Sequence, residues 1–478
     1  MFAGDGRPPT RAEPKHERSR AAARARENRR REPEETILHI HPADVDDGAL
    51  AAPISRPYAW TVFALAFALL LSDYMSRQVL NAVFPLLKAA WGLSDTRLGS
   101  LSGIVALMVG TLTFPLSVLA DRWGRVRSIT LMAALWSVAT LGCAAATSYG
   151  ELLVARAFVG VGEAAYGSVG VALILGLFPP HLRSTLTGAF MAGGAFGSVL
   201  GMALGGAVAT QLGWRASFGA MACLGFALVV CFRLVVTERR IAGSGARAAR
   251  SGRERTPALA HASLRTVLAE LFSTVSVVCA YVGSGLQLFI MGAVIAWMPS
   301  FLNRYYALPP DKAAAAAAGF VLLGGSGMIA CGIVTDRLSR ACPERKWAMA
   351  IVYCAISFAL LAIGFRLSPG APQLGLLALG MFVVAGTSGP AGAMVANLTP
   401  PSIHSPAFAT LTLVNNLLGL APGPLVTGFI ADRIGLVGAL QIAPLVALAS
   451  AFAFAVGRFR YGDGLRRLNP LSPSAAAE

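Results

Sequence analysis

The chain has 478 residues, of which 55% are hydrophobic and only 13% are charged. Soluble domains have roughly 45–50% apolar and about 25% charged residues, so this composition, with a mean hydropathy of +0.62, excludes an ordinary water-soluble protein. The net charge of +16 would suit a nucleic-acid partner, but residues 1–57 contribute almost none of it. The excess of basic residues therefore belongs to the hydrophobic part of the chain.

Residues 1–57 are rich in Arg, Glu and Ala and contain too little apolar surface to fold alone. No hydrophobic segment precedes residue 58, which argues against a secretory signal peptide. We expect these residues to form a disordered cytoplasmic tail, and residues 461–478 to form a cytoplasmic C-terminal tail.

Residues 58–459 are a succession of apolar segments of about 20 residues, the length that an α-helix needs to cross a membrane. The predicted spans are 58–82, 97–120, 128–147, 152–177, 184–209, 214–236, 270–299, 314–335, 347–367, 372–397, 405–430 and 436–457. Such lengths exclude a porin-like barrel, whose strands alternate apolar and polar residues over roughly ten positions. The predicted fold is an all-α membrane protein with twelve transmembrane helices.

Basic residues between the spans predict the orientation of the chain. The loops after even-numbered spans carry more than twice as many Lys and Arg residues as the loops after odd-numbered spans. Both termini are therefore expected in the cytoplasm, with the protein in the plasma membrane. Because topology explains most of the net charge, nucleic acid is not an expected partner.

The two halves of the chain repeat each other. Asp121-Arg122 closes the second span and Asp336-Arg337 the eighth, Pro85 ends the first and Pro299 the seventh, and Gly197-x-x-x-Gly201 resembles Gly419-x-x-x-Gly423. These features recur at offsets of 214 to 222 residues, which predicts two six-helix bundles, 58–236 and 266–460, joined by a cytoplasmic linker at 237–265. Parallel repeats of this kind place a binding site between the bundles and allow alternating access.

Two motifs give the chain a family resemblance. Ser117-Val-Leu-Ala-Asp121-Arg122-Trp-Gly124-Arg125 matches G-x-x-x-D-R-x-G-R except at its first position, and Arg156-Ala-Phe-Val-Gly160-Val-Gly162 matches R-x-x-x-G-x-G. The chain thus resembles the transporters of the major facilitator superfamily. The resemblance implies a monomeric secondary transporter that moves a small-molecule substrate across the lipid bilayer by alternating access.

Within the superfamily, the chain resembles the spinster-like branch most. Asp73-Tyr74-Met75-Ser76-Arg77 is similar to the N-Y-x-D-R of that branch, and Gly162-Glu163-Ala-Ala-Tyr166 also agrees. The chain departs from the pattern at Ser76, where the branch has Asp, and its own acid lies at Asp73. The resemblance implies a lysolipid-like or sphingolipid-like substrate. Sugar-acid or aromatic-acid symporters share the pattern and are the alternative, together with drug or metabolite exporters.

Only four charged residues lie well inside the predicted spans, namely Asp73, Arg77, Arg156 and Glu163. Charge at this depth is costly, so we expect these residues to face the bundle interior and to form pairs. The spacings favour Asp73 with Arg77 and Arg156 with Glu163, since each pair shares one helical face. A carboxyl group between an apolar cavity and an arginine can gain or lose a proton as the cavity opens. We therefore predict that Asp73 and Glu163 couple transport to protons.

The remaining predicted site residues are polar groups expected in the cavity. Substrate binding or charge pairing is assigned to Arg77, Arg156, Ser76, Tyr74, Tyr166, Gln287 and Asn416. The alternative is that the four charges form a purely structural salt-bridge network between the first and fourth spans.

A gating latch is predicted at the cytoplasmic ends of the second and eighth spans. Its residues are Asp121, Arg122, Arg125, Asp336 and Arg337. The carboxylates can pair with arginines and with the positive end of a neighbouring helix. Charges that merely set topology are the alternative. The glycine series from Gly193 to Gly205 is expected to be a packing face.

The sequence offers little for an enzyme. The dinucleotide-like Gly160-Val-Gly162 lies inside a span without a preceding strand, and there is no G-x-S-x-G elbow or Walker loop. We therefore expect no cofactor, no metal and no direct use of ATP, with a proton gradient as the energy source. A non-transporting membrane sensor is the other class to consider.

Overall fold

A computed structural model of the chain describes residues 55–238, 270–340, 342–400 and 403–468. Within these ranges the chain forms helices and turns and contains no strand. Most of the predicted tails and of the predicted linker at 237–265 lies outside the described residues. The twelve-helix fold predicted from the sequence is confirmed, as the helix bounds below show.

The first half contains six membrane-length spans. Its helices are α2 (Arg56–Trp91), α3 (Asp95–Trp123), α4 (Arg125–Ala145), α5 (Tyr149–Glu163), α6 (Tyr166–Leu177), α7 (Pro180–Leu212) and α8 (Trp214–Val235). The fourth span consists of α5 and α6, because the helix is interrupted at Ala164 and Ala165.

The second half repeats this pattern. Its helices are α11 (Val275–Tyr305), α12 (Pro310–Leu338), α13 (Arg345–Gly364), α14 (Ala371–Val384), α15 (Ser388–Leu398), α16 (His404–Val414), α17 (Pro422–Ile442), α18 (Val446–Phe459) and the short α19 (Tyr461–Leu468), with a π-helical turn at Asn415–Leu420. Residues Pro406–Phe459 form a helical stretch of 54 residues, about 80 Å at 1.5 Å per residue, which is too long for one crossing. Gly435 divides it with a φ of 81°, which favours glycine, so the eleventh and twelfth spans are separate.

The predicted ends of the first and seventh spans were wrong. Pro85 and Pro299 lie inside α2 and α11, which continue to Trp91 and Tyr305. Proline removes one backbone donor, but membrane helices tolerate this when neighbouring helices satisfy the freed carbonyl group. Gly92, in the left-handed conformation, ends α2 instead.

The predicted glycine packing face on α7 is confirmed, because it lies against α2. A Cβ atom on Gly197 would come within 2.5 Å of the Leu71 carbonyl oxygen, and one on Gly201 would come equally close to Met75. The second half repeats the contact, since Gly419 meets the carbonyl oxygen of Gly285 and Gly423 that of Phe289. The contacted residues are again 214 positions apart, so the duplication extends from sequence to packing.

We expect Gly201→Ala to destabilise the fold, because its methyl group would meet the backbone of Met75 rather than a movable side chain. Overpacking of this kind costs about 1–3 kcal/mol. Thermal unfolding of the purified protein measures the effect. Gly188→Ala is the control on the same helix, since nothing lies within 4 Å of a Cβ there; equal melting temperatures for the two variants would contradict the packing role.

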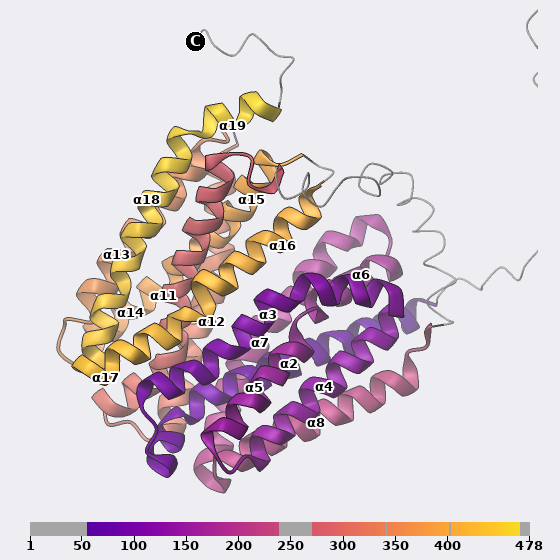
Figure 1. The fold of residues 1–478 in the computed structure, drawn as a ribbon, viewed down its shortest axis with the longest axis vertical. Coiled ribbons are helices and arrows are strands. Elements are labelled where there is room, and N and C mark those ends of the chain that lie inside the picture. The colour runs from indigo at the N-terminus through magenta and orange to yellow at the C-terminus, as the bar shows by residue number, and fades with distance from the viewer. Residues whose placement is uncertain (1–54, 239–269, 341, 401–402, 469–478) are drawn as a thin grey trace, which may run out of the picture. The chain divides into compact units, whose positions relative to one another are not determined.

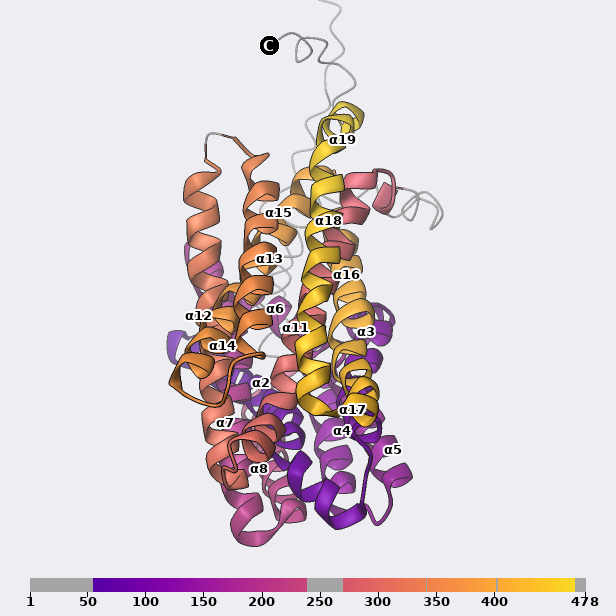
Figure 2. The same ribbon diagram turned by 90° about the vertical axis from the view of Figure 1, so that its left-hand side faces the viewer.

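The helices define two ends of the molecule. We call the end where α2 begins and α18 ends the terminal end, and the opposite end, which contains the α3 N-terminus and Gly435, the distal end. The two halves approach each other toward α17 and diverge toward α6 and α15 (Figure 1). Figure 2 shows the second-half helices running side by side, with α19 beyond α18.

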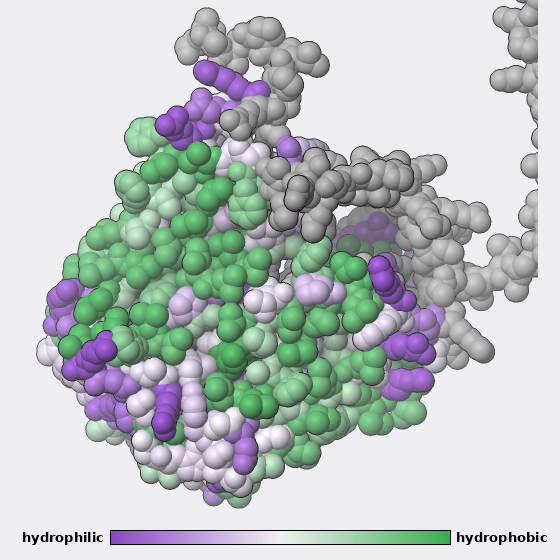
Figure 3. All heavy atoms as spheres, viewed as in Figure 1, coloured by the Kyte–Doolittle hydropathy of each residue, from purple (hydrophilic) through white to green (hydrophobic). Residues whose placement is uncertain are grey.

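The surface between the two ends is apolar. Figure 3 shows hydrophobic residues over most of the face, with hydrophilic residues gathered near its edges. Large apolar side chains such as Phe114, Phe158 and Phe452 are more than half exposed on the spans. Such exposure suits contact with lipid rather than with water.

Candidate functional site

The four intramembrane charges come together between α2 and α5. Asp73 and Arg77 lie on α2, and Arg156 and Glu163 lie on α5. Asp73, Arg156 and Glu163 are almost completely buried. The interior position expected for the four charges is observed for these three, whereas Arg77 is partly exposed. The pairing of the four differs from the expectation.

The ion pair of the cluster joins the two helices. Arg77 Nη1 lies 3.9 Å from Glu163 Oε2, with 19% of the arginine side chain and 3% of the glutamate side chain exposed. The carboxyl group of Asp73 lies beside that of Glu163. Two neighbouring carboxyl groups can share one proton, because ionising both would bring like charges together, so this arrangement can hold a proton.

Arg156 does not form the ion pair that its spacing from Glu163 suggested. Its guanidinium group donates to the carbonyl oxygens of Ser76 at 3.2 Å, Arg77 at 3.3 Å and Leu101 at 3.4 Å. These acceptors lie on α2 and α3. Arg156 therefore connects three helices through their backbones and is not exposed to a substrate in this conformation.

A break in the fourth span follows Glu163 directly. Ala165 has a φ of −112° and a ψ of 0°, which separates α5 from α6. Thr113 of α3 donates to the Ala164 carbonyl oxygen at 2.7 Å, and Tyr166 Oη donates to that of Ala66 at 2.7 Å. Neighbouring helices thus fix the break, which lies beside a buried carboxyl group.

Several buried polar atoms around the cluster have no hydrogen-bond partner among the residues that the structure describes. They are Asp73 Oδ1, Glu163 Oε1, Ser72 Oγ, Ser76 Oγ and Trp136 Nε1. Buried polar groups in proteins are usually paired. Their concentration here indicates a place where water or a polar ligand can bind.

The other predicted cavity residues are dispersed. Ser76 is buried on α2 beside Arg156, Tyr74 packs against Gly194 of α7, and Tyr166 is buried against Trp136. In the second half, Gln287 Nε2 donates to Ser357 Oγ at 2.8 Å and its side chain is fully buried, so the structure does not place it in an open cavity. Asn416 lies in the π-helical turn, and its Oδ1 has no hydrogen-bond partner within the described part of the chain.

A polar extension of the cluster toward the distal end was not predicted from the sequence. Asn81 Nδ2 donates to Gln78 Oε1 at 2.7 Å, and Ser102 Oγ donates to Asn81 Oδ1 at 3.2 Å. Gln78 and Asn81 follow Arg77 by one and four positions on α2. Their side chains are neutral, so the rarity of charged residues in apolar spans does not distinguish them.

The predicted latch is not assembled among the described residues. Asp336 and Arg337 are exposed, and neither forms an ion pair with another residue that the structure describes. Arg122 is also exposed, whereas Arg125 Nη1 donates to the Ala172 carbonyl oxygen at 2.9 Å. The side chain of Asp121 lies outside the described residues.

Gly124 of the loop motif has a local explanation. Its φ is 92°, and a Cβ would lie 2.6 Å from Glu238 Oε1. Glu238 accepts from the amides of Val126 and Arg127, at 3.1 and 3.3 Å, and so caps α4. This glycine therefore allows the residues that follow α8 to pack against the start of α4.

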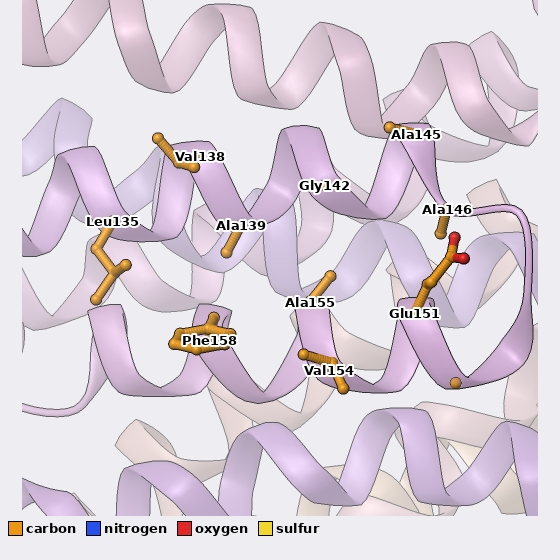
Figure 4. A pocket seen from close by; sticks show the side chains of 11 residues that line it. Leu135, Val138, Ala139, Gly142, Ala145, Ala146, Glu151, Val154, Ala155 and Phe158 are labelled. Atoms are coloured by element: carbon orange, nitrogen blue, oxygen red, sulfur yellow. The ribbon is translucent and has the colours of Figure 1, made fainter.

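A separate groove of about 680 Å³ runs between α4 and α5. Figure 4 shows side chains of the two helices facing each other across it, with Glu151 at one end. Apart from Glu151 its lining is apolar, and it includes none of the four charges. The groove therefore lies apart from the candidate site.

Together, the fold and the cluster define a class: a helical membrane protein with two similar halves and a polar, titratable site within the first. The family model of the Major Facilitator Superfamily matches residues 65–389. The chain belongs to the Major Facilitator Superfamily.

Its relatives include proteins named as transporters of organic acids and proteins named as spinster homologues. The hexuronate transporter of Bacillus subtilis (strain 168) is 24% identical over 373 residues, which cover 76% of this chain and 86% of that protein. Protein spinster homolog 1 of Xenopus laevis is 24% identical over 402 residues, which cover 80% and 75%. A bacterial homolog of the human lysosomal transporter Spinster, crystallised inward-facing and unoccupied, has the same fold, with a TM-score of 0.72, 18% identity, and coverage of 88% of this chain and 100% of that chain. The resemblance to the spinster-like branch is confirmed.

Proposed function

We propose that this protein is a proton-coupled secondary transporter of an organic anion. Its terminal end faces the cytoplasm, as the basic loops favour. Transport uses the proton gradient, needs no cofactor, and requires one copy of the chain in the bilayer. The observation that carries the proposal is the contact of Arg77 with Glu163, beside a carboxyl pair that can hold a proton.

Arg77 can exchange partners more easily than the other three charges. Its side chain is partly exposed, and its 3.9 Å ion pair with Glu163 is long. An anionic substrate that binds the guanidinium group removes the counter-charge of Glu163. Glu163 then holds a proton more tightly, so binding of the anion and binding of the proton favour each other.

For the substrate, the proposal is an amphipathic anion such as a lysolipid or a sphingoid phosphate. The resemblance to the spinster-like branch supports this class. The second candidate is a sugar acid or an aromatic acid. It is supported by relatives named hexuronate, L-galactonate and gallate transporters.

The two substrate classes can be separated by binding to the purified protein. Thermal-shift titrations with a lysophospholipid, sphingosine phosphate, glucuronate and gallate are expected to identify one anionic class. Arg77→Gln should weaken that binding by tenfold or more, because it removes the anion's counter-charge. Arg340→Gln, which removes an exposed arginine from the loop after α12, is the control. Unchanged affinity of Arg77→Gln would rule out Arg77 as the anion site.

A further inference from the structure

A second charged cluster lies at the distal end, where the two halves of the chain meet. Asp95 begins α3, and its side chain is only 4% exposed. It pairs with Lys88 Nζ at 2.6 Å, from its own half, and with both guanidinium nitrogens of Arg304 at 2.7 and 2.8 Å, from the other half. A two-point contact of this kind is strong and directional.

A reciprocal contact lies beside it. Asp432 of α17 accepts from the backbone amides of Asp95 at 2.7 Å and Thr96 at 2.9 Å, and from Thr96 Oγ1 at 2.6 Å. A carboxylate from the second half thus caps a helix of the first half, where the helix dipole favours negative charge. Each half therefore contributes one carboxylate, and each carboxylate binds the other half.

The backbones beneath these contacts touch directly. Gly99 and Gly103 of α3 lie against the carbonyl groups of Pro424 and Ala421, and Gly428 lies against that of Asp95, with no room for a Cβ atom at any of the three. The ionic contacts therefore form only when α3 and α17 are fully closed on each other. Separating the two halves breaks the contacts of Asp432 with Asp95 and Thr96, and it breaks the bridge from Arg304 of α11 to Asp95.

We propose that Arg304, Asp95 and Asp432 are functional residues of the transport cycle that hold the distal end shut. We call them, with Thr96, the distal latch. Lys88 has a different part, because it belongs to the same half as Asp95 and stays with it when the halves separate. It supplies a counter-charge for the buried Asp95 in the open state, so the opening step does not leave Asp95 unpaired.

This inference rests on the proposed alternating access, but its test does not require transport. Spin labels at Gly150→Cys and Ser368→Cys, exposed distal positions in the two halves, with the native cysteines replaced, report the distal distance by pulsed electron resonance. Arg304→Gln and Asp432→Asn should each raise the long-distance fraction about tenfold, because truncating one partner of a charged contact across an interface is costly. Lys88→Gln, the matched control, should not raise that fraction, because Lys88 stays with Asp95 when the halves separate.

The outcomes are decisive in either direction. If Arg304→Gln and Asp432→Asn both retain the distances of the unsubstituted protein, or if Lys88→Gln opens the distal end equally, the latch does not control opening. A failure of proton coupling would look different, since transport would lose its dependence on the pH gradient while the distance changes persisted.

Discussion

Glu163→Gln is expected to abolish accumulation of substrate against its gradient while leaving exchange of substrate across the membrane intact. The amide keeps the shape of the side chain and a hydrogen-bonding group toward Asp73, but it cannot bind and release a proton. One coupled proton supports about a tenfold accumulation ratio per pH unit. In proteoliposomes with a pH gradient, this ratio should therefore fall to one in the variant, whereas counterflow should persist.

Glu151→Gln is the matched control for this experiment. Glu151 lies on the same helix as Glu163, but it is exposed and accepts from Thr147 at the end of the span. The Glu151→Gln variant should leave accumulation of the substrate unchanged. If Glu163→Gln still accumulates substrate in proportion to the pH gradient, Glu163 is not the coupling residue. The alternative, in which the four charges form a structural salt-bridge network, is then favoured.

The twelve spans could be predicted from the sequence because the length of an apolar segment is a local property that the membrane dictates. Their ends could not all be predicted. Proline commonly breaks helices in water-soluble proteins. In α2, however, Pro85 is followed by six more helical residues. The membrane and the packed neighbouring helices, which no local pattern describes, decide where such a helix ends.

The four intramembrane charges could also be recognised from the sequence, since charge is rare in apolar spans. Their partners could not, because helical spacing describes one helix at a time. Arg77 pairs with Glu163 across two helices, and Arg156 binds backbone carbonyl groups that have no sequence signature. Asp95 and Asp432 lie outside the predicted spans, where charge is common, so nothing in the sequence distinguishes them, although each binds a residue more than 200 positions away.

Arg156→Gln is expected to destabilise the protein severely, in contrast to Arg77→Gln. Arg156 is 1% exposed and donates to carbonyl groups on α2 and α3, so its loss removes hydrogen bonds between three helices and leaves buried space. Breaking a buried charged contact typically costs about 3–5 kcal/mol. Thermal unfolding of the purified protein should show a large drop in melting temperature.

Arg156→Lys separates the charge of Arg156 from the geometry of its guanidinium group, and Arg77→Gln is the comparison at the neighbouring arginine. Lysine keeps the charge but lacks the planar fork that reaches several acceptors at once, so Arg156→Lys should remain clearly less stable than the unsubstituted protein. Arg77→Gln should have a melting temperature close to that of the unsubstituted protein, because Arg77 is partly exposed and forms one long ion pair. If Arg156→Gln melts at the same temperature as the unsubstituted protein, the backbone contacts of Arg156 do not hold the helices together. Arg156 is then a candidate for a second anion site in the unsubstituted protein.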